Sequence, residues 1–160
     1  NIGDTVQFTS LKPYRVIVSG RIKHFISAFG EHVIGKEVET AIQLATENTT
    51  FRINEFTVAP QIAPKEGLPY HEWFIEFDTE NSAEPNNLED FALQLDALMR
   101  KQNMYYDDLI EGKVLRTLVI TKVPKNGFQE YMKSIGKLGG QNKIPRLSND
   151  RKIVDELDKK

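Results

Sequence analysis

The chain has 160 residues, of which 39% are hydrophobic and 28% charged, and its formal net charge at pH 7 is −2. This composition predicts one globular domain with a real core and excludes a disordered polypeptide. The nearly balanced charge gives no general basis for attraction to nucleic acid or to a membrane, so we expect neither as a partner.

The sequence contains no cysteine, which excludes disulfides and thiolate metal sites and fits a reducing cytoplasm. No apolar run approaches the roughly 20 residues that a membrane-spanning helix needs, and no signal peptide is visible, so we expect a cytoplasmic protein. The chain starts with Asn1 instead of Met, in a stretch, NIGDTVQF, that is typical of a strand pair. We therefore expect it to be a piece of a longer protein.

The N-terminal part of the sequence predicts a β-hairpin, a short strand and a helix. Two β-prone runs, residues 2–9 and 14–19, flank a turn, which is typical of a hairpin. A short strand is expected over 24–29 and ends at Gly30. Apolar residues at helical spacing then predict an amphipathic helix over 34–47.

The rest of the sequence predicts further strands and helices. Asn87 has the properties of a helix N-cap, with acidic residues in the first turn behind it. Asn126, with Gln129 three residues later, resembles a capping box. The expected elements are strands over 51–62, 70–78 and 117–123, helices after Asn87, over 126–135 and near 153–157, and a glycine-rich loop over 136–146. Because they alternate without regular βαβ repeats, we expect an α+β fold.

A few residues are candidates for chemistry, although each also has an ordinary structural interpretation. Asp4 follows a glycine, and a carboxylate can accept two hydrogen bonds from a diol. Arg21 carries the planar donor group that suits a nucleotide. Lys143 lies in the glycine-rich loop, where a mobile lysine could reach a phosphate. Taken alone, the three would be a turn residue, a surface arginine and part of a basic loop.

The three histidines show no spacing typical of a metal site, so no metal site is expected. His71 shares its strand face with Trp73, Ile75 and Phe77, which predicts core packing. The glycine-rich loop lacks the G-x-x-x-x-G-K-[ST] spacing of a phosphate-binding P-loop.

The segment 20–39, GRIKHFISAFGEHVIGKEVE, resembles the hinge of adenylate-forming enzymes. The whole chain resembles the C-terminal part of the auxin-responsive Gretchen Hagen family of acyl-acid–amido synthetases, and its bacterial members most of all. The blocks that carry this resemblance are Ile2–Asp4, Gly20–Glu39, Asn103–Tyr106, Lys125–Phe128 and Gln141–Arg146.

The resemblance implies an ATP-dependent ligase that joins a carboxylic acid to AMP and then transfers the acyl group to an amine, which we expect to be that of an amino acid. It puts Asp4 on the ribose, Arg21 near the nucleotide, and Lys143 as the catalytic lysine presented to the reacting groups. The resemblance also implies that the C-terminal domain acts as a lid. The lid would rotate between the half-reactions about a hinge at Lys23. The cofactor would be ATP, with Mg²⁺ bound through it mainly by the large domain.

The same resemblance implies that Gly30, Glu31 and His32 line the substrate channel. Plant members of the family carry a lysine close to His32, so this sequence departs from them there. Residues 1–21 would form the hairpin and hinge that join an N-terminal large domain, and residues 22–160 the α+β lid with a small mixed sheet packed by helices. The large domain would be a partner, and this chain alone would be inactive.

Two alternatives stay open at this stage. The chain could be a stand-alone ferredoxin-like module that binds a small ligand and regulates, in which case deleting residues 1–19 should affect stability or ligand binding. It could also be the lid of a thioester-forming enzyme. Such enzymes usually close with Pro-Lys-x-x-x-Gly-Lys, and here Pro124-Lys125 is not followed by that Gly-Lys.

Overall fold

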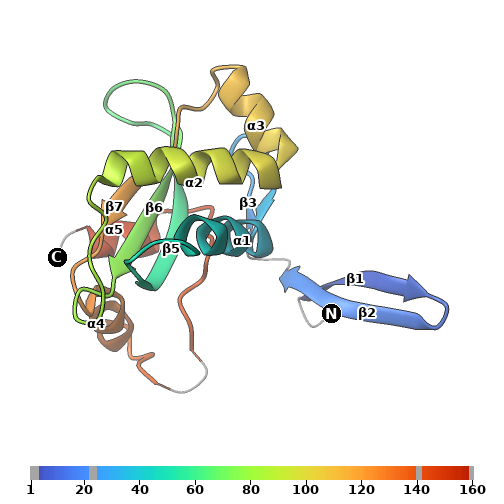
Figure 1. Ribbon diagram of the computed structural model, residues 1–160, viewed down its shortest axis with the longest axis horizontal. Coiled ribbons are helices and arrows are strands. Elements are labelled where there is room, and N and C mark those ends of the chain that lie inside the picture. The colour runs from blue at the N-terminus through green and yellow to red at the C-terminus, as the bar shows by residue number, and fades with distance from the viewer. Residues whose placement is uncertain (1–3, 22–24, 140–141, 159–160) are drawn as a thin grey trace.

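The computed structural model describes residues 4–21, 25–139 and 142–158 (Figure 1). Its strands are β1 (Asp4–Leu11), β2 (Tyr14–Arg21), β3 (Phe25–Ile26), β4 (Val33–Ile34), β5 (Ile53–Gln61), β6 (Tyr70–Phe77) and β7 (Val119–Lys122). Its helices are α1 (Gly35–Thr46), α2 (Leu88–Gln102), α3 (Met104–Glu111), α4 (Gly127–Ser134) and α5 (Lys152–Leu157). The expected α+β class is confirmed.

A three-stranded mixed sheet forms the centre of the fold, in the order β5-β6-β7. Strand β5 pairs antiparallel with β6, and β6 pairs parallel with β7. All residues of β6 after Tyr70 are buried, because helices cover both faces of the sheet. Pro60 lies inside β5, which is tolerated because β5 is at the edge of this sheet.

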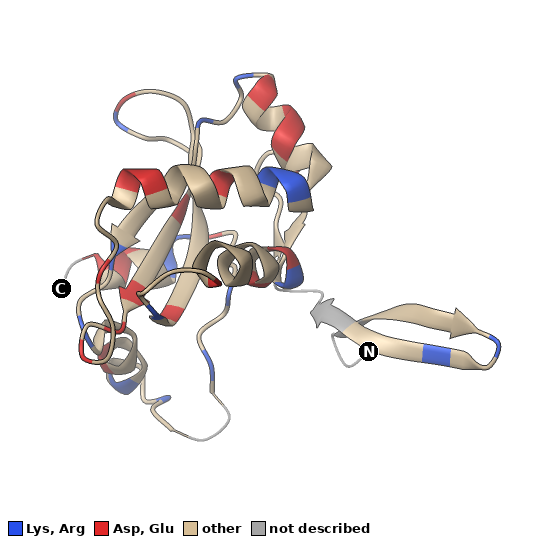
Figure 2. Ribbon diagram, viewed as in Figure 1, with Lys and Arg blue, Asp and Glu red and all other residues tan. Residues whose placement is uncertain are grey.

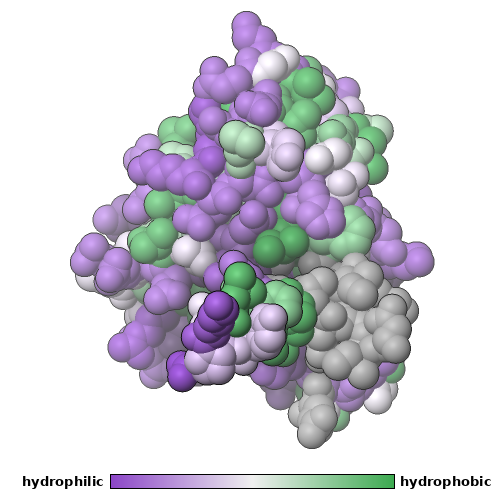
Figure 3. Space-filling view, turned by 90° about the vertical axis from the view of Figure 1, so that its right-hand side faces the viewer, coloured by the Kyte–Doolittle hydropathy of each residue, from purple (hydrophilic) through white to green (hydrophobic). Residues whose placement is uncertain are grey.

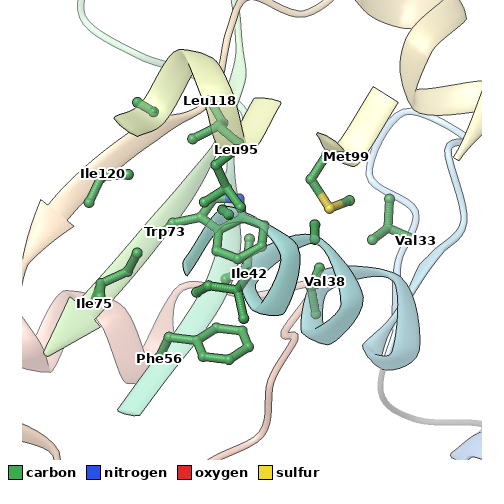
Figure 4. Packing of buried hydrophobic residues seen from close by; sticks show 14 of the residues in the cluster. Val33, Val38, Ile42, Phe56, Trp73, Ile75, Leu95, Met99, Leu118 and Ile120 are labelled. Atoms are coloured by element: carbon green, nitrogen blue, oxygen red, sulfur yellow. The ribbon is translucent and has the colours of Figure 1, made fainter. Parts of the chain in front are cut away.

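The larger hydrophobic core lies between the sheet and helices α1 and α2 (Figure 4). Trp73 of β6 is at its centre, and the ring of Phe56 stacks on it with centroids 5.6 Å apart. Apolar residues on one side of each helix meet this face, among them Ile42 from α1 and Leu95 from α2. A smaller core around Phe74 packs the opposite face against α4 and α5.

Helix α2 has the cap that the sequence predicts. The Asn87 side chain accepts hydrogen bonds from the backbone N–H of Glu89, at 2.9 Å, and of Asp90. Acidic residues occupy the first turn and the basic pair Arg100 and Lys101 the last, as the red and blue ends of this helix show in Figure 2. Both charges complement the helix dipole.

The capping box predicted at Asn126 is wrong. Asn126 has a left-handed backbone, φ 62°, and its side chain makes no cap hydrogen bond. The buried carboxylate of Glu76, on β6, instead accepts hydrogen bonds from the backbone N–H of Asn126 and Phe128. The N-terminal N–H groups of α4 are therefore capped by a side chain distant in sequence and not by a local capping box.

The hairpin β1–β2 projects from the rest of the fold (Figure 1). Its large hydrophobic side chains are exposed, with Phe8 at 58% and Tyr14 at 78% exposure. Figure 3 looks onto this end of the molecule and shows hydrophobic residues at the surface. Within the described part of the chain, no helix has the length and apolar character needed to cross a membrane.

Candidate functional site

The hairpin brings the two predicted nucleotide-binding residues together. Asp4 begins β1 and Arg21 ends β2, and the two are opposite each other in the antiparallel register. They are the first and last residues of the paired strands, at the end of the hairpin opposite its turn. The predicted hinge residue Lys23 lies outside the described residues.

The predicted channel residues Gly30, Glu31 and His32 lie in the second half of the turn, residues 27–32, that joins β3 to β4. Gly30 and His32 both have left-handed backbones, with φ of 94° and 47°. His32 is exposed, and its ring lies 4.8 Å from that of Phe25, centroid to centroid. The role of these three residues in a substrate channel stays a prediction.

Glu31 points inward from this turn and is fully buried. Its Oε1 lies 2.9 Å from Nε2 of His71, and its Oε2 accepts a hydrogen bond of 2.8 Å from the backbone N–H of Phe29. Burial acts to raise the pKa of the Glu31 carboxyl, but the hydrogen bonds from His71 and the backbone outweigh it, so that pKa lies below its ordinary value. Glu31 therefore holds the turn from inside, and its carboxylate does not face solvent.

His71 belongs to the core, as its strand position predicts, and besides its contact with Glu31 it packs against a second buried hydrogen-bonded pair. Its ring lies 5.0 Å from the ring of Tyr106, whose hydroxyl donates a 2.6 Å hydrogen bond to Oδ1 of Asp96. The same oxygen accepts a 3.1 Å hydrogen bond from the backbone N–H of Leu118. Burial and the charge of Asp96 raise the pKa of the Tyr106 phenol well above its ordinary value.

A cleft of about 270 Å³ opens beside His32 and Ile34 and is closed on the other side by Asn103, Met104 and Tyr105. Met104 and Tyr105 are exposed, at 68% and 60%. In the sequence, residues 103–106 stand out only through the family resemblance. The sequence does not predict that α3 begins there.

Asn103 connects the two walls of this cleft. Its side-chain oxygen accepts a 2.8 Å hydrogen bond from the backbone N–H of Tyr106, which caps α3. Its Nδ2 donates at 3.1 Å to Oε2 of Glu37, which also accepts from the backbone N–H of Ile34. A single buried amide thus fixes the start of α3 relative to the start of α1.

Lys143 lies elsewhere, on the loop that follows α4. It is exposed and lines a second cleft, of about 320 Å³, together with Glu55, Glu76 and Lys137. An exposed amine beside an open cleft can meet an anionic group that enters it. In the expected glycine-rich loop Gly136 and Gly139 have left-handed backbones, while Gly140 and Gln141 lie outside the described residues.

Arg146 holds the end of this loop. Its guanidinium bonds to Glu39 of α1, at 3.3 Å, to Glu55 of β5, and to the backbone carbonyl of Phe56. It also lies over the Phe56 ring, 4.5 Å from the centroid. The sequence identifies Arg146 only as part of a basic loop, because its partners are 90 or more positions away.

Beyond Arg146 the chain runs along β5. The backbone N–H of Val58 donates to the carbonyl of Arg146, and that of Ser148 donates to the carbonyl of Val58, both at 3.0 Å. Asn149 then reaches β3 and the residue after it. Its Nδ2 donates to the carbonyl of Phe25 at 2.8 Å, and its Oδ1 accepts from the backbone N–H of Ser27 at 2.9 Å.

Helix α1 lies next to both candidate regions. Glu37 lines the cleft beside His32. Glu39, two residues later, bonds to Arg146 at the end of the loop that carries Lys143. Among the described residues, no group of three or more His, Asp or Glu side chains is arranged to hold a metal ion.

Comparison with known proteins identifies relatives of this fold. A sequence model described as the GH3 family C-terminal domain matches residues 36–152. A solved structure of a GH3.15 acyl acid amido synthetase superposes with a TM-score of 0.75 at 18% identity, covering 99% of this chain and 30% of that one. The structure titled AtGH3.15 acyl acid amido synthetase in complex with 2,4-DB gives a TM-score of 0.74 at 17% identity, covering 99% and 29%.

At these identities the structural likeness concerns the fold. This chain spans less than a third of the length of those synthetases. A search of curated proteins gave no match.

Proposed function

The chain belongs to the GH3 family, and on that premise we propose that it acts as the C-terminal lid of an ATP-dependent acyl-acid–amido synthetase. The observation that carries the proposal is the match of the family's C-terminal domain over residues 36–152. The same match speaks against an independent ligand-sensing module. The activity would belong to a longer protein, and this chain alone would be inactive.

The proposed reaction has two steps. In the first, a carboxylate oxygen of the acyl acid attacks the α-phosphorus of ATP, forming the acyl adenylate and releasing pyrophosphate. In the second, an amine, which we propose to be that of an amino acid, attacks the acyl carbon, and AMP leaves as the amide forms. The lid would serve both steps by rotating about Lys23 between them.

Within this scheme Asp4 would accept hydrogen bonds from the ribose hydroxyls, and Arg21 would lie near the nucleotide. Their opposite positions in the hairpin register support a shared ligand. Lys143 would stabilise the charge that develops on the reacting groups during adenylation. Its exposure beside an open cleft and the fixed position of Arg146 behind it support this role.

Residues 1–21 would belong with the N-terminal large domain, as the structural link between it and the lid of residues 22–160. The exposed hydrophobic side chains of the hairpin support this, because apolar surface of this kind is typical of a contact with another unit. ATP would enter with Mg²⁺ as substrate, and the large domain would supply most of the contacts to the metal.

The test uses the full-length protein that contains this chain. Pyrophosphate release with ATP is measured across a panel of carboxylic acids, for wild type, Lys143→Ala and the control Lys133→Ala, which removes an exposed lysine of α4. We expect release that depends on one class of acid and falls at least about a hundredfold in Lys143→Ala alone. Absence of acid-dependent release in a folded protein that binds ATP would refute the proposed function.

A further inference from the structure

The turn Gly30–His32 has a backbone geometry that needs support from outside the turn. His32 is not a glycine, yet its φ of 47° lies in the left-handed region, next to Gly30 at 94°. A non-glycine residue is held there only when surrounding structure fixes it. The packing around this turn is therefore part of its geometry.

The support comes from the central strand of the sheet through one buried contact. His71, 2% exposed on β6, has Nε2 at 2.9 Å from Oε1 of the fully buried Glu31. A carboxylate only accepts, so His71 is the donor in this contact. Behind it the Tyr106 ring, 5.0 Å away, is itself fixed by its hydrogen bond to Asp96.

The support matters because the turn borders the 270 Å³ cleft between His32 and Tyr105. A Cβ added at Gly30 would meet no atom within 4 Å, so the backbone at this position is open to an approaching molecule. A displacement of Glu31 would change the direction of both neighbouring peptide groups. The buried pair of Glu31 and His71 thus lies directly beneath a turn whose other side is open.

We propose that His71 is a positioning residue for the amine-transfer step, which it serves by holding Glu31 and thereby the Gly30–His32 turn, where the family resemblance implies a substrate channel. This inference rests on the proposed function, since that function supplies the amine. It assigns His71 no contact with substrate. It also separates the turn from Lys143, which we propose for the first step and whose cleft is lined by other residues.

Two substitutions at His71 distinguish positioning from general stability. His71→Phe keeps a ring beside Tyr106 but removes the donor to Glu31. His71→Gln has an amide nitrogen that can take the place of Nε2. In the full-length protein, ATP–pyrophosphate exchange without amine reports the first step, and amide formation against amine concentration reports the second.

We expect His71→Phe to raise the KM for the amine about tenfold or more and to leave pyrophosphate exchange within about twofold, because a buried charged hydrogen bond is lost. His71→Gln should restore the KM to within about threefold of wild type. Hydrogen exchange at the amides of residues 29–32 should be faster in His71→Phe and close to wild type in His71→Gln. That second readout does not require turnover.

Other results would overturn the inference. Equal losses in both steps, or no loss in either, would remove the positioning role and leave the proposed function intact. If His71→Phe does not fold, Glu31→Gln decides, and an unchanged KM for the amine in that variant refutes the proposal. A wild-type protein without pyrophosphate exchange or amide product would instead refute the proposed function, and this inference with it.

Discussion

Replacing Tyr106 by phenylalanine tests the buried hydrogen bond between Tyr106 and Asp96, next to His71. Tyr106 is fully buried, and its hydroxyl donates to Asp96, which is 5% exposed. The substitution keeps the ring and its packing on His71, so no large cavity forms. It leaves the Asp96 carboxylate with the backbone N–H of Leu118 as its remaining donor in the described contacts.

The expected cost follows from that geometry. A hydrogen bond to a charged group contributes about 1.5–3 kcal/mol, and a buried acceptor that loses its donor keeps the desolvation penalty. We therefore expect Tyr106→Phe to lower the free energy of unfolding by about 2 kcal/mol. For a chain of this length, that corresponds to a fall in Tm of about 4–8 °C.

Urea unfolding of the 160-residue chain, followed by circular dichroism, measures this change as a lower midpoint with an unchanged m value. The matched control is Tyr105→Phe, one residue earlier on α3 and 60% exposed, with an expected change within about 0.5 kcal/mol. A double-mutant cycle with Asp96→Asn should give a coupling of about 1 kcal/mol or more. Equal effects of Tyr106→Phe and Tyr105→Phe would refute the assigned hydrogen bond.

Three further predictions follow from other contacts. The pKa of Tyr106 is raised in the folded protein, so the unfolded chain loses the phenol proton first as pH rises. The contribution of Tyr106 to the free energy of unfolding is therefore complete below about pH 10. Above that pH it falls by up to about 1.4 kcal/mol per pH unit until the folded-state pKa is reached. Subtracting the stability of Tyr106→Phe at each pH isolates this slope, and parallel curves would contradict it. Gly127→Ala should cost about 1–3 kcal/mol in chemical unfolding, because the new Cβ would lie 2.5 Å from Cγ1 of buried Val123, whereas Gly35→Ala, with open space, should be neutral or stabilising. Arg146→Met should speed hydrogen exchange over residues 142–148 without changing exchange in α2. An equal change in exchange rate over both segments, or no change in either, would show that Arg146 does not hold the loop.

The sequence predicts the elements whose signals are local. The strand over 70–78 and the helix over 34–47 agree with β6 and α1 to within two residues, because burial on the sheet and one apolar helix face leave clear patterns. The two-residue strand β4 and helix α3 are not predicted. Strand β4 is too short to show a period, and α3 follows α2 after the single residue Asn103.

The candidate site is predictable only in part. Residues such as Asp4 and Lys143 come from the family resemblance, which carries the chemistry, and their roles stay predictions. Neither the resemblance nor the local pattern predicts the partner of Glu31. His71 is 40 positions away, and the pattern of its strand indicates only core packing. Glu76 as the cap of α4 is a similar case, 50 positions from Asn126. Contacts of this kind depend on the topology of the sheet and not on spacing along the chain.

The bonds of Asn149 to β3 have a consequence for the order of folding. This one side chain closes loops of 122 and 124 residues, so β3 receives these two hydrogen bonds only after nearly the whole chain has been synthesised. Contacts of such long range are slow to form, because closing the loop costs entropy before any bond is gained. On the ribosome the segment around β3 would therefore be among the last to take its final form, and a chain that stops before Asn149 would leave it without these bonds.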